Sequence, residues 1–401
     1  MSLMHPDEAR NRLLEGVLPR DAELVPLIGC AGRVLAEPLL ARLTQPPFPA
    51  SAMDGWAVRF ADLPGPLHIL GAASAGHGFA GRVEARQTVR IFTGAPLPDG
   101  ADTVVVQEEV TATETDALLT GEGPPRPGAH VRPRGQDFVQ GAELIAAGTR
   151  LTARHIGLAA AAGHATALVH ARPRVMLVTT GDELVPPGET PGPGQIVSSN
   201  GLMLAALLAQ AGAQVRDLGI LPDRRDEIAA AIAAAAPETD LLITIGGASV
   251  GDHDLIIPAL SDLGAAVDFW KIALRPGKPL IAGRLGATRV LGLPGNPVSA
   301  YVCALLFAGP LLRRMGGLDP AIATITCALA TPLPATGPRR DHLRARLLAD
   351  GRVEAYAGQD SAHLARLAAA DVLIVRDANS PPADPGAVVT CIPLDMFPDV
   401  A

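Results

Sequence analysis

Hydrophobic and polar residues follow different patterns along the chain, and these patterns predict four zones. Residues 5–45 begin with apolar residues on one helical face, and a second short helical pattern follows at 33–40. Residues 46–137 contain short apolar runs separated by Pro and Gly, which predicts a small β-module. Helical character returns at 152–163. We therefore expect this β-module to be inserted into a mainly helical N-terminal domain made of two segments, 1–45 and 138–172.

The next zone, residues 173–318, alternates strand patterns with helix patterns, as a doubly wound α/β domain does. The expected strands are 175–179, 215–220, 241–245 and 290–293. The expected helices are 202–211, 225–236, 254–260 and one that begins at Pro297. Short strand patterns return in residues 319–401, which predicts a small β-barrel-like C-terminal module. The predicted fold class is multidomain α/β plus β, with the doubly wound domain at its centre.

Composition narrows the classes of function. Lys and Arg number 33 against 41 Asp and Glu, and aromatic residues are only 3%, which argues against binding to nucleic acid or to an anionic membrane surface. The four cysteines form no CxxC pair, so we expect buried thiols rather than disulfides or a zinc site. The N-terminus mixes acidic and basic residues, unlike a signal peptide. The apolar stretch at 297–312 is short and interrupted by Pro310, which favours a buried helix, and we expect a cytoplasmic protein.

Three polar loops follow predicted strands of the α/β zone, where such sheets bind ligands. They are residues 179–183, 246–254 and 292–297. The second loop offers backbone N–H groups to an anion, and the third has Asn296 at a helix start. Either loop alone could be an ordinary tight turn, but two on one sheet edge favour phosphate binding. The candidate substrate-binding residues here are Gly246, Gly247, Ser249, Asp252, Pro294 and Asn296.

Carboxylates gather at the same predicted edge. Mg²⁺ prefers a few carboxylate oxygens together with substrate phosphate and water, so acids beside a phosphate site suit it. Asp223 is equally well explained as a helix cap. The acids at this edge are Asp182, Glu183, Asp223, Asp252 and Asp254.

The segment 269–279 holds both lysines of the chain, Lys271 and Lys278, among cations that are otherwise all arginine. Two lysines in one short motif suggest a requirement for a compact, strongly hydrated ammonium group. An oxyanion is its natural counter-charge. The alternative is a solvated charged turn.

In the β-module, the Pro-rich stretch 46–49 predicts a stiff arm that projects Asp54. Residues 90–96 and 132–137 are comparable junctions between a strand and a turn. Composition alone indicates that all three segments are ordinary turns. The histidines form no HExxH or triad pattern, and Ser51, Ser249 and Ser361 lack a nucleophile-elbow sequence.

Seven motifs occur in order along nearly the whole chain: SAMDGWAV, RIFTGAPLP, RGQD, TTGDEL, GGASVGDHD, FWKIALRPGKP and GLPGNPVS. Together they resemble the MoeA-type molybdopterin molybdenumtransferases, which are related to the E domain of gephyrin. The α/β zone alone resembles the wider molybdopterin-binding fold, shared with adenylyltransferases of the same pathway and with CinA-type proteins.

The resemblance implies an enzyme that inserts molybdate into adenylylated molybdopterin and releases AMP in a Mg²⁺-dependent reaction. It implies a homodimer in which the β-module of one subunit faces the α/β zone of the other, and a transient contact with a molybdopterin adenylyltransferase. The implied catalytic residues are Asp54, Thr93 and Asp137 on the partner-facing module, and Glu183, Asp223 and Asp254, which are also the implied Mg²⁺ ligands. The residues implied around molybdate are Lys271, Arg275, Lys278, Pro279, Ser361 and an arginine.

Two departures from the family pattern affect these assignments. The family often has lysine where this chain has Arg275, and a guanidinium keeps the charge but changes the geometry. The arginine from the last module could be Arg339, Arg340 or Arg344, of which Arg340 is preferred.

Two other functions compete with this interpretation. An adenylyltransferase of the same fold would act on ATP, but it needs only the α/β zone. A non-catalytic scaffold would not need the full set of charged residues. The chain has no obvious covalent nucleophile, so the chemistry would rest on positioning and charge neutralisation.

Overall fold

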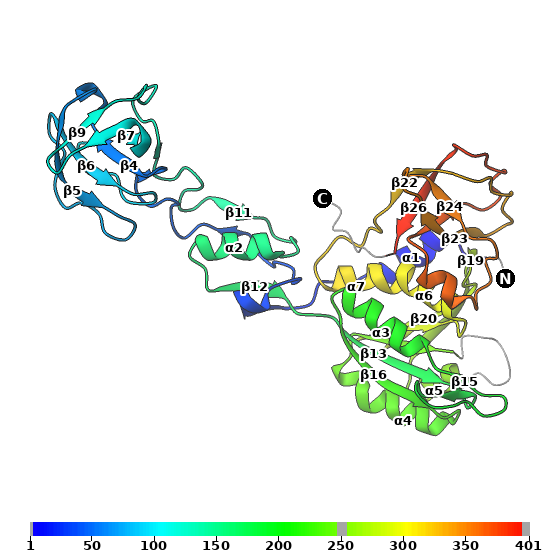
Figure 1. Cartoon of the computed structure of the whole chain (residues 1–401). Helices are drawn as coiled ribbons and strands as arrows, with labels where there is room; N and C mark the ends of the chain where they lie inside the picture. The colour runs from blue at the N-terminus through cyan, green and yellow to red at the C-terminus, as the bar shows by residue number, and fades with distance from the viewer. Residues whose placement is uncertain (1–2, 247–254, 395–401) are drawn as a thin grey trace.

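The computed structural model describes residues 3–246 and 255–394. The molecule is elongated, with a β-module at one end, an α/β part and a C-terminal module at the other, and a slim part between them (Figure 1). The chain passes through the slim part twice, once on the way to the β-module and once on the way back.

The α/β part is built on one six-stranded sheet. Its spatial order is β16 (Gln214–Leu221), β13 (Arg174–Thr180), β17 (Leu241–Ile245), β21 (Thr288–Leu293), β20 (Pro279–Leu285) and β18 (Ala266–Lys271). The first four strands are parallel, and β20 is antiparallel to both of its neighbours. The expected central α/β domain is therefore present, with two strands, β18 and β20, that the sequence pattern did not predict.

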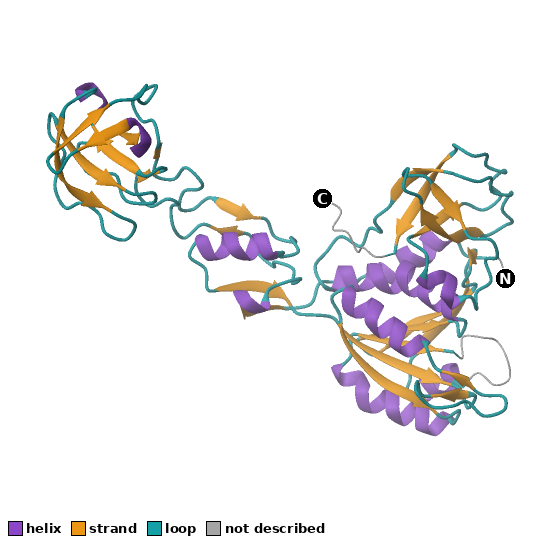
Figure 2. Ribbon diagram, viewed as in Figure 1, coloured by secondary structure: helices purple, strands orange, loops and turns teal. Residues whose placement is uncertain are grey.

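Helices cover both faces of this sheet (Figure 2). Because neighbouring side chains of a strand point to opposite faces, Leu177 of β13 packs with one set of helices and Met176 with the other. The first set is α1 (Pro6–Leu14), α3 (Asn200–Gln210), α6 (Pro297–Cys303) and α7 (Gly309–Met315). The second set is α4 (Arg225–Ala235) and α5 (Ile256–Asp262).

The apolar stretch after Pro297 is one continuous helix to Met315. By length and composition alone it could cross a membrane, but 89% of its most apolar window is buried inside the protein. It is thus a core helix, as expected. The expected interruption at Pro310 is wrong, because a π-helical turn at Ala304–Ala308 precedes the proline and the chain remains helical through it.

The prediction of a mainly helical N-terminal domain is wrong. The slim part contains one α-helix, α2 (Ala153–Ala161), and two small sheets. One sheet pairs β1 (Ala22–Pro26) with β12 (Thr166–His170), and the other pairs β2 (Leu39–Leu40) with β11 (Glu143–Ile145). Residues 33–40 are extended, because Val34 and Leu35 pair with residues more than a hundred positions away. Helix α1 instead packs on the α/β part through Ala9 and Leu13. Local apolar spacing could not show these distant partners.

The β-module is a six-stranded sheet with the order β7-β4-β6-β5-β9-β8, flanked by the pair β3 and β10. The chain enters and leaves it at one place, where the Gln45 N–H donates to the Phe138 carbonyl at 2.9 Å. The strands are β3 (Ala50–Ser51), β4 (Gly55–Val58), β5 (Leu67–Ala73), β6 (Gln87–Ile91), β7 (Thr103–Val106), β8 (Val110–Ala112), β9 (Asp116–Leu119) and β10 (Val131–Arg132).

The C-terminal module is a curled sheet that begins with a strand from the α/β part. Its order is β19 (Leu274–Arg275), β23 (Arg340–Leu347), β25 (Val372–Arg376), β26 (Val388–Pro393) and β22 (Ile325–Ala328), with β24 (Val353–Ala355) beside β23. A bridge between Leu329 and Val353 brings the two sides of this sheet together around a small apolar core. All four cysteines of the protein are buried and free, as expected.

A buried histidine makes the stability of the C-terminal module depend on pH. His342 of β23 is 4% exposed, and its Nδ1 has no hydrogen-bond partner. Burial, assisted by the positive charge of Arg340, lowers its pKa to about 3, while Asp377 and Asp7 oppose this shift. The unfolded chain therefore binds a proton between pH 6.5 and 3 that the folded chain does not. This contribution to the stability is fully present above pH 6.5 and is lost as the pH falls, by about 1.4 kcal/mol per pH unit.

We expect His342→Phe to remove most of this pH dependence. Urea unfolding at pH 7 and pH 5 gives the free energy of unfolding at each pH. Hydrogen-exchange protection of the β23 amides reports the stability of the C-terminal module itself. The exposed His77 provides the matched control, because His77→Phe should leave the pH dependence of the unfolding free energy as it is in the parent protein. An equal slope in His342→Phe and the parent would contradict the assignment.

Candidate functional site

The carboxyl ends of the parallel strands form one side of the sheet, which is called the sheet edge here. Its acids lie where β13 and β16 end. Asp182 follows β13 and Asp223 follows its neighbour β16. The Asp182 N–H donates to Asp223 Oδ2 at 3.3 Å, and the Asp223 N–H donates to Asp182 Oδ1 at 3.1 Å. The Glu183 carboxylate lies against Gly181, where a Cβ would come within 2.6 Å of Oε2. These acids do meet, while Asp254 and Asp252 lie outside the described residues.

This donor set is compatible with Mg²⁺. Within the described residues no three His, Cys, Asp or Glu side chains gather closely enough to hold a metal by themselves. Mg²⁺ is commonly held by one or two carboxylates together with substrate phosphates and water. The exposed oxygens of Asp182, Glu183 and Asp223 satisfy that requirement.

The middle of the edge lies where β17 and β21 end. The Gly246 N–H donates to the Leu293 carbonyl at 3.3 Å, so Gly246 lies beside the last residue of β21. Asn296 is the N-cap residue of α6, but its side chain makes no capping bond and its Nδ2 donates to Ser361 Oγ at 3.1 Å. The structure thus joins Ser361 of the last module to this edge. Pro294 is buried beside Asn296, and the predicted Gly247 and Ser249 lie outside the described residues.

Asn200 is a residue at this edge that the sequence pattern indicated only as a helix start. Its Nδ2 donates to the Gly295 carbonyl at 2.7 Å, and its buried Oδ1 has no hydrogen-bond partner. A buried acceptor without a partner is costly in a protein interior. Asn200 therefore ties the start of α3 to the loop after β21.

The cations lie at the other end of the same edge, on β18 and β20. Lys271 and Pro279 are directly opposite each other, and the Ile272 N–H donates to the Lys278 carbonyl at 2.8 Å. Gly277 forms the turn at φ +106°, where a Cβ would lie 2.5 Å from Cys303 Sγ, so the turn that presents Lys278 requires glycine. Among the described residues neither lysine has a carboxylate at ion-pair distance. Arg275 is exposed and lies 3.9 Å from Asp341.

The three candidate arginines of the last module have different surroundings. Arg340 binds Asp7 of helix α1 at 3.0 and 3.2 Å and Asp377 at 2.8 Å, so its guanidinium is occupied by carboxylates. Arg344 is 1% exposed and donates through Nη1 to the Asp360 carbonyl at 2.8 Å, while Nε and Nη2 have no partner. Arg344 therefore supports the turn that carries Ser361. No pattern in the sequence indicates the contact between Arg340 and Asp7.

The β-module carries the other predicted residues. Asp54 Oδ1 accepts hydrogen bonds from both the N–H and the Oγ1 of Thr93, each at 2.8 Å. The N–H bond, then the hydroxyl bond, lower the pKa of the Asp54 carboxyl. Asp137 lines a cavity of about 520 Å³ together with Phe48 and with Gly94, the neighbour of Thr93. Asp54, Thr93 and Asp137 thus belong to one side of this module.

The predicted residues therefore form two groups rather than one. The β-module and the sheet edge lie at opposite ends of the elongated molecule (Figure 1). Within one chain the acids of the β-module cannot reach the carboxyl ends of β13 and β21.

Three family models match this chain in succession. They are described as the MoeA N-terminal region (domain I and II), over residues 4–163, a probable molybdopterin binding domain, over 176–314, and the MoeA C-terminal region (domain IV), over 326–394. The central model covers the sheet whose edge carries the loops and charges described above.

Similar proteins cover most of the chain. A molybdopterin molybdenumtransferase of Haemophilus influenzae is 38% identical over 78% of this chain and 77% of its own length. One from Nostoc is 36% identical over 89% of this chain and 85% of its own length. A crystal structure of a molybdopterin biosynthesis MoeA protein from Pyrococcus horikoshii has a TM-score of 0.83 at 28% identity, and covers 98% of this chain and 99% of that chain. The chain belongs to the MoeA family of molybdopterin molybdenumtransferases, in molybdenum cofactor biosynthesis.

Proposed function

We propose that this enzyme inserts molybdate into adenylylated molybdopterin and releases AMP in a Mg²⁺-dependent reaction. The observation that carries the proposal is the order of charges along one sheet edge. Acids lie at the β16 and β13 end, Gly246 and Asn296 lie in the middle, and Lys271 and Lys278 lie at the β20 and β18 end. This order suits a substrate that has a nucleotide phosphate at one end and a metal oxyanion at the other.

Each group has a physical task in this proposal. Lys271, Arg275 and Lys278 attract the molybdate dianion, for which this chain of net charge −8 otherwise has little affinity. The backbone N–H groups of the loops beside Gly246 and Asn296 hold phosphate oxygens. Glu183 and Asp223 would hold Mg²⁺, which would neutralise phosphate charge and polarise the phosphoanhydride. The protein then acts by positioning and by charge neutralisation.

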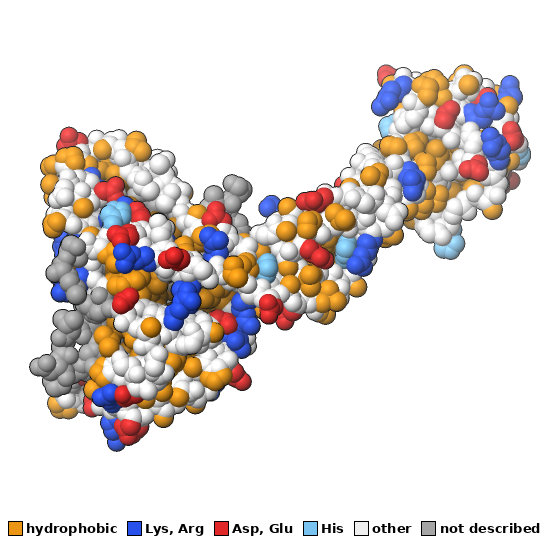
Figure 3. Space-filling view, turned by 180° about the vertical axis from the view of Figure 1, so that it is seen from behind, with side chains coloured by type: hydrophobic (Ala, Val, Ile, Leu, Met, Phe, Trp, Pro, Cys, Tyr) orange, Lys and Arg blue, Asp and Glu red, His pale blue; other side chains and the backbone are white. Residues whose placement is uncertain are grey.

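We further propose a homodimer in which the β-module of one subunit faces the sheet edge of the other. Asp54, Thr93 and Asp137 have no reacting partner at their own end of the chain, and they gain one only from a second copy. Hydrophobic side chains are exposed on the slim part and the adjoining base of the β-module (Figure 3), including Leu24 at 67% and Ile28 at 93%. Obligate pairs commonly bury about 2,000 Å² or more. A cytoplasmic location and a transient contact with a molybdopterin adenylyltransferase complete the proposal.

The two competing functions make different demands. An adenylyltransferase would consume ATP and would not need the β-module or the contact between Ser361 and Asn296. A scaffold would need neither Lys271 nor Lys278. Purified protein with adenylylated molybdopterin, molybdate and Mg²⁺ should release AMP and yield metal-bound cofactor without consuming ATP. ATP consumption, or no AMP release, would overturn the proposal.

Replacing Asp223 by Asn should lower AMP release by about tenfold or more and raise the Mg²⁺ concentration required, because one metal-binding charge is lost. The volume hardly changes, and the Asp223 backbone N–H still donates to Asp182, so the fold should persist. The matched control is Asp226→Asn, which removes an exposed charge from the first turn of α4. If Asp223→Asn releases AMP at the parental rate, these acids are caps and turn residues.

A further inference from the structure

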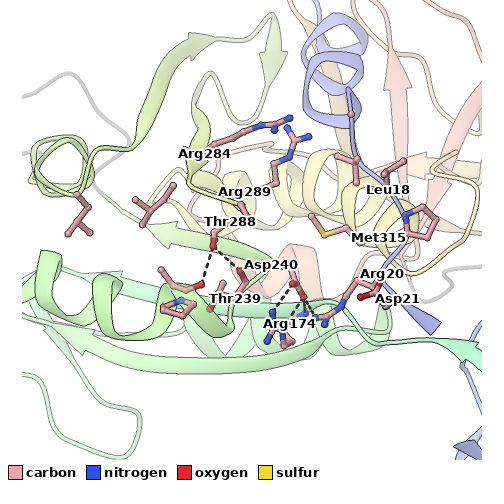
Figure 4. Close-up of a pocket in the computed structure, with 18 of the residues that line it drawn as sticks. Leu18, Arg20, Asp21, Arg174, Thr239, Asp240, Arg284, Thr288, Arg289 and Met315 are labelled. Atoms are coloured by element: carbon pink, nitrogen blue, oxygen red, sulfur yellow. Dashed lines mark hydrogen bonds and ion pairs between the residues drawn. The ribbon is translucent and has the colours of Figure 1, made fainter. Parts of the chain in front are cut away.

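A second large cavity lies at the opposite edge of the same sheet from the site above. Its volume is about 770 Å³, and it lies at the end of the sheet where β13, β17 and β21 begin. Arg174, the first residue of β13, and Thr288, the first residue of β21, line it. The chain after helix α1, residues 16–21, and Met315 at the end of α7 line its other sides (Figure 4). The length of the strands separates this cavity from the loops that follow them.

Two arginines of this cavity have no carboxylate at ion-pair distance within the described residues. Arg284 of β20 and Arg289 of β21 are strand partners, and both donate through Nη2 to the Glu15 carbonyl, at 3.4 and 2.6 Å. A Cβ on Gly16 would lie 3.7 and 4.0 Å from these Nη2 atoms, so the two guanidinium groups converge on one point. Within the described residues neither forms an ion pair with a carboxylate. Burial, and next the charge of Arg284, lower the pKa of Arg289, and Glu15 offsets this only in part.

The other two arginines of the cavity provide a comparison. Arg20 and Arg174 both form ion pairs with Asp240, and the Arg174 N–H also donates to this carboxylate at 2.7 Å. Figure 4 shows these groups gathered around Asp240, with Arg284 and Arg289 together at the other side. The single carboxylate of Asp240 is therefore shared by two arginines, and Asp21 is the other acid in the lining. The four arginines of the lining outnumber its two carboxylates, and both ion pairs to Asp240 lie away from Arg284 and Arg289.

The rest of the lining is partly apolar. Leu18 is 78% exposed, and Leu285 and Met315 line the same space. The volume falls in the range of small-molecule sites and exceeds the need of a lone inorganic ion. A ligand that matches this lining has an anionic group at one end and an apolar body.

We propose that this cavity binds a small organic phosphate, with its phosphoryl group between Arg284 and Arg289. Two adjacent guanidinium groups match the charge of a phosphate monoester, which is close to −2 at pH 7, better than that of a monoanionic carboxylate. Guanidinium forks also match phosphate oxygens in a bidentate manner. The ligand replaces the Glu15 carbonyl as the shared acceptor. This site is separate from the proposed reaction and does not depend on it.

The test is calorimetric titration of the full-length protein with phenyl phosphate, inorganic phosphate and benzoate. Phenyl phosphate should bind tightest, inorganic phosphate more weakly because it lacks the apolar body, and benzoate most weakly because it carries one charge. Arg289→Ala should weaken phenyl phosphate binding by about ten- to a hundredfold, as expected for a lost charge-assisted contact. Arg284→Gln, at an exposed strand position, should also weaken it and is the less disruptive change if Arg289→Ala fails to fold.

Two controls separate this cavity from other cationic surfaces. Arg154→Ala removes an exposed arginine from α2 and should leave binding unchanged. Lys278→Ala alters the opposite edge of the sheet and should also leave phenyl phosphate bound at this cavity. Binding that is absent in the parent protein, or that persists in Arg284→Gln and disappears in Lys278→Ala, would overturn the proposal. Tighter binding of benzoate than of phenyl phosphate would overturn its ligand class.

Discussion

Mixing two nearly inactive variants of this protein should restore transfer activity. In an Asp54→Ala chain the β-module is defective and the sheet edge is intact, while in an Asp223→Asn chain the reverse holds. If each site joins the β-module of one subunit to the sheet edge of the other, a mixed dimer contains one site in which both parts are intact. Random exchange of equal amounts should then give about a quarter of the parental activity, measured as AMP release after joint refolding.

The control for this experiment mixes two variants that are both defective in the β-module. Asp54→Ala mixed with Thr93→Ala should stay inactive, because Thr93 holds the Asp54 carboxylate through two hydrogen bonds and every site would lack one of them. Recovery in that mixture, or none in the first, would contradict a site shared between subunits. A fully active monomer in light scattering at micromolar concentration would do the same.

Replacing Lys278 by Ala should weaken molybdate binding far more than binding of the adenylylated pterin. The lost charge-assisted contact should cost about ten- to a hundredfold in apparent affinity for molybdate. The backbone pairing at Ile272 uses only the Lys278 carbonyl, so the turn should survive the change. Titration of molybdate against metal insertion gives the measurement, and a high molybdate concentration should restore the parental yield.

Lys278→Arg tests the geometry of the same contact. The charge is kept, but a planar guanidinium should fit a tetrahedral oxyanion on this turn poorly, so the molybdate curve should still shift. Arg154→Ala is the control for a general loss of positive charge. If Lys278→Arg is silent at every molybdate concentration, the turn is merely solvated.

The strands that sequence patterns predicted best are those buried on both faces. Leu241–Ile245 was predicted with its observed bounds, because a parallel central strand is a continuous apolar run between turn residues. The strands β18 and β20 were missed, since their mixture of apolar, charged and small residues resembles a loop. The extended residues 33–40 were predicted as helix, since their pairing with Arg150 and Val169 is invisible to a local pattern.

The same limit applies to the candidate site. The positions of Asp223, Gly246 and Asn296 followed from the rule that ligands bind at the carboxyl ends of strands. The contacts that assemble the site join residues far apart in the chain, with separations of 65 residues for Asn296 and Ser361 and 333 for Asp7 and Arg340. No spacing in the sequence reports such contacts, so they became visible only in the fold.

The narrow junction at Gln45 and Phe138 has an evolutionary consequence. The incoming and outgoing chains are hydrogen-bonded to each other there, as the Asp137 N–H also donates to the Gln45 carbonyl at 3.0 Å. The β-module between these two residues is therefore a cassette, that is, an insert whose two ends are adjacent. Recombination at this one place exchanges the whole cassette between related genes without displacing a single strand of the central sheet.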